Sequence, residues 1–145
     1  VQVRFIVTSQ PIAFIVPEVV RVRAAQGGAA VTSNVAVGNR GRGTLSVSGV
    51  TATVQSGTGW LSAANASNFQ GATLTLTPGS LAPGTYRGNV AIAVNAINGP
   101  NLNVPVEMEV VANPTPQISF NGVLNNADFR AGDDMGVGTI AALFG

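Results

Sequence analysis

The stretch TPGSLAPGTYRGNVAIAV, residues 77–94, joins a turn-rich half to a half in which apolar residues alternate with small or polar ones. Alternation with a period of two is typical of a β-strand that buries one face. The pattern therefore predicts a strand that begins near Tyr86. Its inward face carries Tyr86, Gly88, Val90, Ile92 and Val94.

Tyr86 is the only tyrosine of the chain, and two roles compete for it. Its ring can stand at the edge of the core while its hydroxyl reaches the loop backbone, as in the tyrosine corner of sandwich domains. Gly88 leaves room beside such a ring, and burying an aromatic side chain contributes roughly 1.5–3 kcal/mol. The alternative role is a platform for a ligand. We favour the structural pin, and we expect Tyr86→Ala to lower stability by about 3–5 kcal/mol.

The rest of the chain follows the same period. No window carries a convincing helical stripe, and short alternating segments are separated by turns rich in Gly and Pro. Gly49 interrupts one segment and shifts the inward phase from Val47 to Val50, as a β-bulge does. Short strands at regular spacing predict an all-β fold, an antiparallel β-sandwich. The expected strands lie within residues 20–24, 31–37, 45–54, 74–76, 86–94 and 102–110.

The composition excludes several function classes. The 145 residues are 46% hydrophobic but only 9% charged, and the net charge is +1, too small to attract nucleic acid or an anionic membrane. The chain has no cysteine and no histidine, which excludes disulfides, zinc clusters and His-dependent triads within it. No apolar run reaches the ~18 residues of a spanning helix. We therefore expect no cofactor, no nucleic-acid partner and no membrane insertion.

The two ends of the chain share a pattern. VQVRFIVTSQP at residues 1–11 and VPVEMEVVANP at residues 104–114 both alternate and then reach a proline, with an offset of 104 − 1 = 103 residues. That offset is about one sandwich domain, which suggests tandem modules. The predicted organisation is an end strand and linker of a preceding module at 1–16, a sandwich at 17–112, and a linker with the truncated start of another module at 113–145.

Four segments of the predicted sandwich occur in a characteristic order: GGAAVTSNVAVGNRGRGTLSVS, GWLSA, GATLTLTPGSLAPGTYRGNVAIAV and LNVPVEMEV. This ordered set resembles the bacterial Ig-like repeats related to BACON domains. The resemblance implies an Ig-like β-sandwich found as a tandem module in secreted or cell-surface bacterial proteins. It implies carbohydrate binding for some members and a spacer role for others, and it transfers no set of sugar-binding residues.

A second resemblance begins after residue 117. ISFNGVLNNADFRAGDDMGVGTIAALFG is similar to the start of a C-terminal module common on large secreted acidobacterial proteins. Asp128 departs from the usual small polar residue, and Gly136-Val137 replaces the usual Ala-Pro. The resemblance implies no known activity. The residues that match are Val123, Asn126, Ala127, Phe129, Gly138, Thr139, Ile140, Phe144 and Gly145.

Three residues of the sandwich are candidates for ligand contact. Trp60 is the only tryptophan, and exposed aromatics often bind sugars, but its place beside Leu61 after a loop favours the core. Arg40 and Arg42 lie in the tight turn NRGRG and could meet an anionic glycan or phosphate. An exposed turn also tolerates charge without any ligand, and we favour that interpretation.

The acidic residues give a weak metal site and no catalytic site. Asp128, Asp133 and Asp134 could offer oxygen ligands to calcium, but their spacing matches no EF-hand loop and an acidic loop is the simpler explanation. Glu107 and Glu109 lie two apart on the outer face of one predicted strand, and no nucleophile motif is present. We expect the chain not to be an enzyme.

These observations favour a structural spacer or interaction module whose partners are neighbouring domains of the same polypeptide. The alternative is a carbohydrate-binding module with a polysaccharide partner. Exposure of Trp60 distinguishes the two, since a buried ring favours the spacer. A third hypothesis is strand pairing with another copy through residues 1–8.

Overall fold

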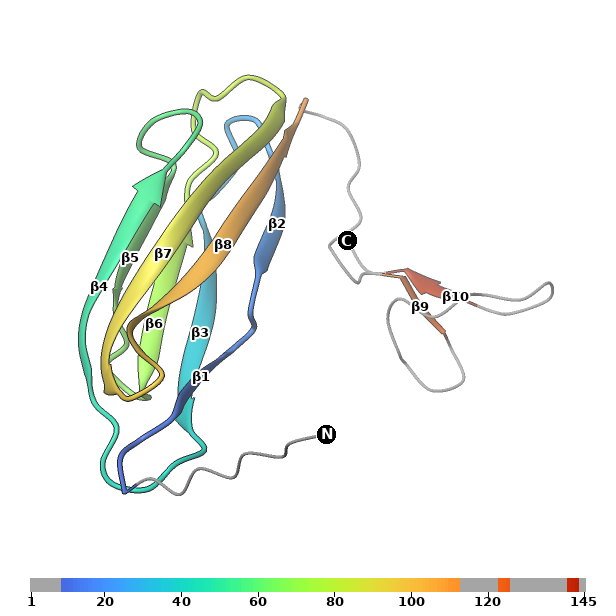
Figure 1. Ribbon diagram of the computed structural model, residues 1–145. Helices are drawn as coiled ribbons and strands as arrows, with labels where there is room; N and C mark the ends of the chain where they lie inside the picture. Colours follow the sequence, from blue (N-terminus) through green and yellow to red (C-terminus); the bar gives the residue numbers. More distant parts are fainter. Residues whose placement is uncertain (1–8, 113–122, 126–140, 144–145) are drawn as a thin grey trace, which may run out of the picture.

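The computed structural model describes residues 9–112 and two short strands, 123–125 and 141–143. The described residues form ten β-strands and no helix. Two four-stranded sheets face each other as a sandwich (Figure 1). The all-β sandwich predicted from the alternation is confirmed.

The first sheet is antiparallel throughout. Its order is β1 (Ala13–Val16), β3 (Val31–Asn39), β6 (Gly71–Leu76) and β5 (Leu61–Asn65). The second sheet has the order β2 (Val20–Ala25), β8 (Gly99–Val111), β7 (Gly84–Ala96) and β4 (Val47–Val54). This arrangement is that of an immunoglobulin-like sandwich.

The pair β2–β8 is parallel, whereas the other strand pairs of the sandwich are antiparallel. The reason lies in the segment β1–β2, which changes sheets at Pro17. Proline has no N–H for a ladder, so the strand that pairs with β3 ends there. The chain continues across to the other sheet and runs beside β8 in the same direction. Arg21 thereby lies opposite Glu107, and Arg23 opposite Glu109.

The sandwich also begins earlier than residue 17, where the sequence interpretation placed its start. β1 pairs with β3, with Ala13 opposite Asn39 and Val16 opposite Ala36. The Asn98 side chain holds the other side of β1, because its Oδ1 accepts from the Ala13 N–H at 2.9 Å and its Nδ2 donates to the Ala13 carbonyl at 2.8 Å. A four-residue strand between two prolines has no alternation to reveal it. The predictions for residues 1–8 and 113–122 lie outside the described residues.

The core lies between the sheets, and the predicted inward residues fill it. Val90 and Ile92 of β7 are fully buried, as are Leu74 and Leu76 of β6. The bulge predicted at Gly49 is confirmed, because the β4–β7 register shifts between Val47 and Gly49. No described buried side-chain nitrogen or oxygen lacks a hydrogen-bond partner.

The described chain enters and leaves the sandwich at opposite ends (Figure 1). At one end, the N–H of Ile97 in the β7–β8 turn donates to the Pro11 carbonyl at 3.0 Å. β8 starts from that turn and has 13 residues, which at about 3.3 Å per residue span roughly 40 Å. At the other end, the Gln26 N–H donates to the Val111 carbonyl at 2.8 Å.

A two-stranded ladder is described in the C-terminal part of the chain. β9 (Val123–Asn125) pairs antiparallel with β10 (Ala141–Leu143), with Val123 opposite Leu143. Two parts of the segment that resembles a C-terminal module are therefore paired with each other.

Candidate functional site

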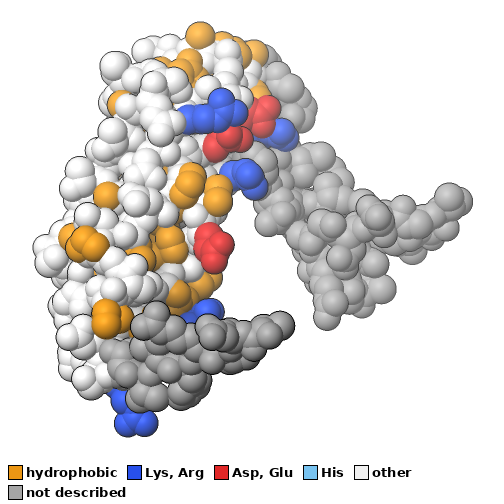
Figure 2. Space-filling view, viewed as in Figure 1, with side chains coloured by type: hydrophobic (Ala, Val, Ile, Leu, Met, Phe, Trp, Pro, Cys, Tyr) orange, Lys and Arg blue, Asp and Glu red, His pale blue; other side chains and the backbone are white. Residues whose placement is uncertain are grey.

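Charged side chains gather on the outer face of the second sheet. In Figure 2 they cluster toward the β2–β8 side of the sandwich. Arg23 Nη2 lies 2.7 Å from Glu109 Oε2, and Arg87 Nε lies 3.1 Å from Glu107 Oε2. Both glutamates lie on the outer face of β8, as the alternation predicts. Exposed pairs of this kind contribute about 0–1 kcal/mol each, so they do not hold the fold together.

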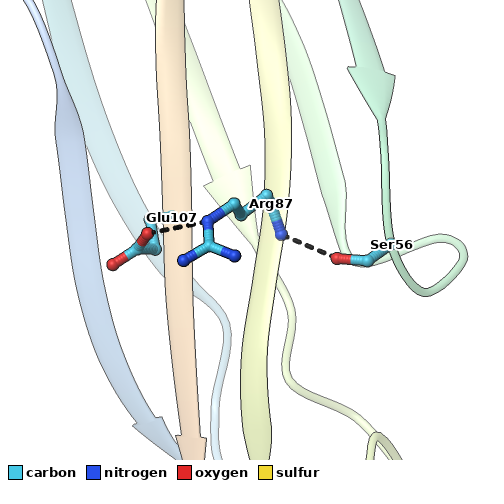
Figure 3. Close-up of polar contacts among 3 residues, drawn as sticks. All are labelled: Ser56, Arg87 and Glu107. Carbon is cyan, nitrogen blue, oxygen red and sulfur yellow. Dashed lines mark hydrogen bonds and ion pairs between the residues drawn. The ribbon is translucent and has the colours of Figure 1, made fainter.

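Arg87, which pairs with Glu107, is also hydrogen-bonded to Ser56 in the loop after β4 (Figure 3). The Arg87 backbone N–H donates to Ser56 Oγ at 2.9 Å. In return, the N–H groups of Gln55 and Ser56 donate to the Arg87 carbonyl at 2.8 and 3.2 Å. Ser56 Oγ is an acceptor here and faces no base, and the chain has no histidine to serve as one. The three residues tie a loop to a strand and form no nucleophilic site.

A shallow hollow of about 260 Å³ opens beside these residues. Small-molecule sites in proteins usually enclose about 300–1,000 Å³, so this hollow is small. Arg21 lines it, is exposed, and makes no hydrogen bond or ion pair with any described residue. A free guanidinium can form a bidentate pair with a carboxylate or a phosphate, so an anionic group is the ligand that this hollow could bind. Its lining is Val19, Arg21, Gln55, Arg87, Gly88, Asn89, Pro105, Val106 and Glu107.

Trp60 is not available as a sugar platform. Its side chain is 1% exposed, and its Nε1 donates to the Ser56 carbonyl at 2.8 Å. The ring lies against Tyr86, with 6.4 Å between centroids and 57° between planes. The structure thus places Trp60 in the core, which is the role that the sequence favours.

Tyr86 closes the corner between β6 and β7. Its hydroxyl donates to the Ala82 carbonyl at 2.8 Å, four residues upstream, which is the predicted tyrosine corner. The ring is only half-buried. Gly88 and Gly57 make space around the two aromatic rings: a Cβ on Gly88 would lie 2.8 Å from a Leu61 methyl, and one on Gly57 would lie 2.8 Å from the Tyr86 ring.

We expect Tyr86→Phe to lower the free energy of unfolding by about 1 kcal/mol, because it removes one hydrogen bond and keeps the ring. Since the ring is half-buried, Tyr86→Ala should cost about 3 kcal/mol, at the lower end of the range for aromatic truncation. Urea denaturation of both variants measures the difference. Equal losses in the two variants would show that the ring itself contributes nothing.

The Arg40–Arg42 turn is anchored to the segment before β1. The N–H of Arg40 donates to the Ile12 carbonyl at 2.9 Å, and that of Arg42 to the Gln10 carbonyl at 3.2 Å. The Arg40 guanidinium lies 4.4 Å from the centre of the Phe14 ring, a cation–π contact. Both arginines are exposed. They lie near the end of the sandwich at which the chain enters, far along β7 and β8 from Arg87.

The predicted acidic cluster, Asp128, Asp133 and Asp134, lies outside the described residues. Within the described ranges, no three His, Cys, Asp or Glu side chains are close enough to hold a metal ion. No helix in this part of the chain is long and apolar enough to cross a membrane.

Sequence reasoning missed Ser56 and Asn98 as structural residues. The Ser56 side chain makes one hydrogen bond to a strand residue 31 positions away, and the Asn98 side chain makes two to a strand residue 85 positions away. The only signal was the polar character of each turn, which many residues share.

Comparisons with known proteins identify the fold. No family profile matches the sequence, and no curated protein matches it. The chain is similar to PapD-like domain 7, an ASH domain, of human CEP192, with a TM-score of 0.50 and 12% identity over 77% of this chain and 94% of that domain. It is also similar to a nucleoside hydrolase-related hypothetical protein of Saccharophagus degradans that is associated with carbohydrate metabolism, with a TM-score of 0.43 and 16% identity.

The second similarity covers 70% of this chain and 26% of the other protein. The first shows an immunoglobulin-like β-sandwich fold. The resemblances to BACON-related repeats and to the acidobacterial module stay predictions.

Proposed function

We propose that this immunoglobulin-like sandwich is a non-catalytic structural spacer or interaction module of a multi-domain bacterial protein that is secreted or displayed at the cell surface. Its partners are the neighbouring domains of the same polypeptide. The observation that carries the proposal is the path of the chain, which enters at one end of the sandwich and leaves at the other, roughly 40 Å away along β8. Such a path sets the distance between whatever precedes and follows.

The side chains that could bind or act on a ligand support this assignment, because they make contacts within the domain instead. Trp60 and Tyr86 pack against each other and bind backbone carbonyls. Ser56 accepts a backbone N–H, and Glu107 pairs with Arg87. Glu107 borders the hollow but is paired with Arg87, and neither Ser56 nor the two aromatic side chains line it.

The alternative, a carbohydrate-binding module, would have to use a surface other than Trp60. The hollow beside Arg21 and Arg87 is the surface that favours it, since it combines guanidinium groups with the polar side chains of Gln55 and Asn89. It lacks an exposed aromatic ring to stack on a sugar, which is why we place this function second.

The spacer function is tested by the distance across the sandwich. The chain has no cysteine, so Ser9→Cys and Ala112→Cys, both at exposed positions, accept spin labels without interference. Pulsed electron paramagnetic resonance should give one narrow distribution of the distance between the two labels, centred at ~40 Å. A broad distribution would contradict a module that holds its neighbours at a set distance.

The carbohydrate function is tested by the fluorescence of Trp60. Because the ring is out of water, we expect blue-shifted emission that soluble polysaccharides leave unchanged. Uronic-acid polymers should be included, since Arg21 is the free cation of the hollow. Binding detected by calorimetry that disappears in Arg21→Gln but not in the exposed-turn control Arg42→Gln would promote the carbohydrate function to first place.

A further inference from the structure

Four strands form the edges of the two sheets, and they differ in how well they resist pairing with another chain. β1 has four residues and stops at Pro17, and β5 has five residues. β2 carries Arg21 and Arg23 on its exposed face. Short length, proline and charge are the features by which natural edges avoid edge-to-edge association. β4 has eight residues, no proline and no charged residue, so it is the least protected edge of the sandwich.

The hydrogen-bond pattern shows which backbone groups of β4 are free. The Gln55 N–H donates to the Arg87 carbonyl, and the Thr53 carbonyl oxygen lies against Gly88 of β7. Hydrogen-bonded pairs of an antiparallel ladder recur every two residues, so Thr51, Thr53 and Gln55 direct their backbone groups toward β7. The residues whose N–H and C=O groups point to the open edge are Val50, Ala52 and Val54.

The core is only partly covered along this edge, although β5 of the other sheet lies beside β4. Val50, Ala52 and Val54 face inward but are only half-buried, as is Ala63 of neighbouring β5. By contrast, Ile92, the β7 residue opposite Val50, is fully buried. In Figure 2 the β4 side of the molecule shows hydrophobic and uncharged side chains and no charged ones. Free backbone groups and a partly exposed apolar seam therefore coincide at β4.

Residues 50–54 read Val-Thr-Ala-Thr-Val, which is the same sequence in both directions. We propose that β4 pairs antiparallel with β4 of a second copy of this chain, about a two-fold axis at Ala52. Val50 then lies opposite the partner's Val54, and Thr51 opposite the partner's Thr53. The palindrome satisfies both halves of such an isologous interface at once, and opposed threonines are a favourable cross-strand pair.

The pairing uses the groups that the isolated sandwich leaves open. The three residues whose backbone groups point to the open edge exchange about six backbone hydrogen bonds with the partner, two for each pair. The half-buried valines of both copies meet across the axis, and no charge opposes another there. The inference rests on the proposed role as an interaction module and names its partner, a second copy.

Sedimentation of the full chain over a dilution series tests the association. We expect a reversible monomer–dimer equilibrium, with amide exchange at Val50, Ala52 and Val54 slowing as concentration rises. The amides of Thr51 and Thr53 serve as internal controls, because they face β7 at every concentration. A chain that stays monomeric up to about 1 mM overturns the proposal.

Charge placed on the outer face of β4 tests the location. Thr51→Lys with Thr53→Lys puts like charges directly opposite each other across the axis and should raise the dimer dissociation constant about tenfold or more. The matched control, Ser62→Lys with Ala64→Lys, places the same charges at exposed positions of edge strand β5 and should leave it unchanged. Dimers that survive the β4 lysines, or that dissociate with the β5 lysines, overturn the proposal.

A charge-swapped pair completes the test. Mixing the β4 lysine variant with Thr51→Glu/Thr53→Glu should restore dimers as heterodimers, whereas each variant alone stays monomeric. Failure to restore them would contradict direct pairing of the two strands. These outcomes are independent of the spin-label distance within one copy, so failure of the spacer role and failure of the dimer are distinguishable.

Discussion

Replacing Trp60 by alanine should lower the free energy of unfolding by about 3–5 kcal/mol, the range for an aromatic side chain removed from a packed core. The ring is 1% exposed, fills the end of the core beside Tyr86, and carries the hydrogen bond to Ser56. The truncation leaves a cavity and also frees the Ser56 carbonyl. Since a domain of this size is stable by only about 5–15 kcal/mol, the variant should melt far earlier in urea.

The matched control for this prediction is Ile97→Ala. Ile97 is a large apolar residue that is 55% exposed in the β7–β8 turn, so its truncation should cost within about 0.5 kcal/mol. A Trp60→Ala loss below about 1 kcal/mol, comparable to the control, would show that Trp60 does not support the core. It would reopen the carbohydrate function.

The second large effect is expected at Gly71, where β6 begins beside β3. Its φ is +149°, in a region that side chains rarely adopt, and a Cβ there would overlap the Val35 carbonyl oxygen. Gly71→Ala must therefore push the two central strands of the first sheet apart. We expect a loss of roughly 2–5 kcal/mol from strain and overpacking together, measured by urea denaturation.

Gly49 provides the control, because a Cβ at that position meets nothing within 4 Å. Gly49→Ala should change stability by less than about 1 kcal/mol, and a reduced entropy of the unfolded chain favours a small gain. Similar losses at both glycines would indicate a general intolerance of β-strands to alanine rather than the backbone contact at Val35.

The two proposals concern different surfaces of one module. Spacing depends on the long axis of the sandwich, which β8 spans from the chain's entrance to its exit. Association depends on β4, at the edge of the sheet farthest from β2. A dimer through β4 would leave both ends of each copy free, so that neighbouring domains in two polypeptides could be held in a defined arrangement.

Features that depend on local period and on residue type could be predicted from the amino-acid sequence. Alternation along residues 86–94 predicted which side chains of β7 face the core, since consecutive side chains of a strand point to opposite faces. Gly49 marked the bulge because a glycine out of phase weakens the ladder at that point. Tyr86 followed by Gly88 indicated the corner that the Ala82 hydrogen bond closes.

Which strands pair with each other could be seen only in the folded chain. Alternation shows which face of a strand is buried but not which strand lies beside it. The parallel pairing of β2 with β8 therefore could not be predicted from the sequence. The segment Ala13–Val16 belongs to the sandwich through its pairing with β3 and through the Asn98 side chain. Ala13 lies opposite Asn39, 26 residues away, and bonds to Asn98, 85 residues away, so no local sequence pattern reveals these contacts. The unpaired edge of β4 likewise follows from the strand order, because β7 pairs with one side of β4 and no described strand pairs with the other.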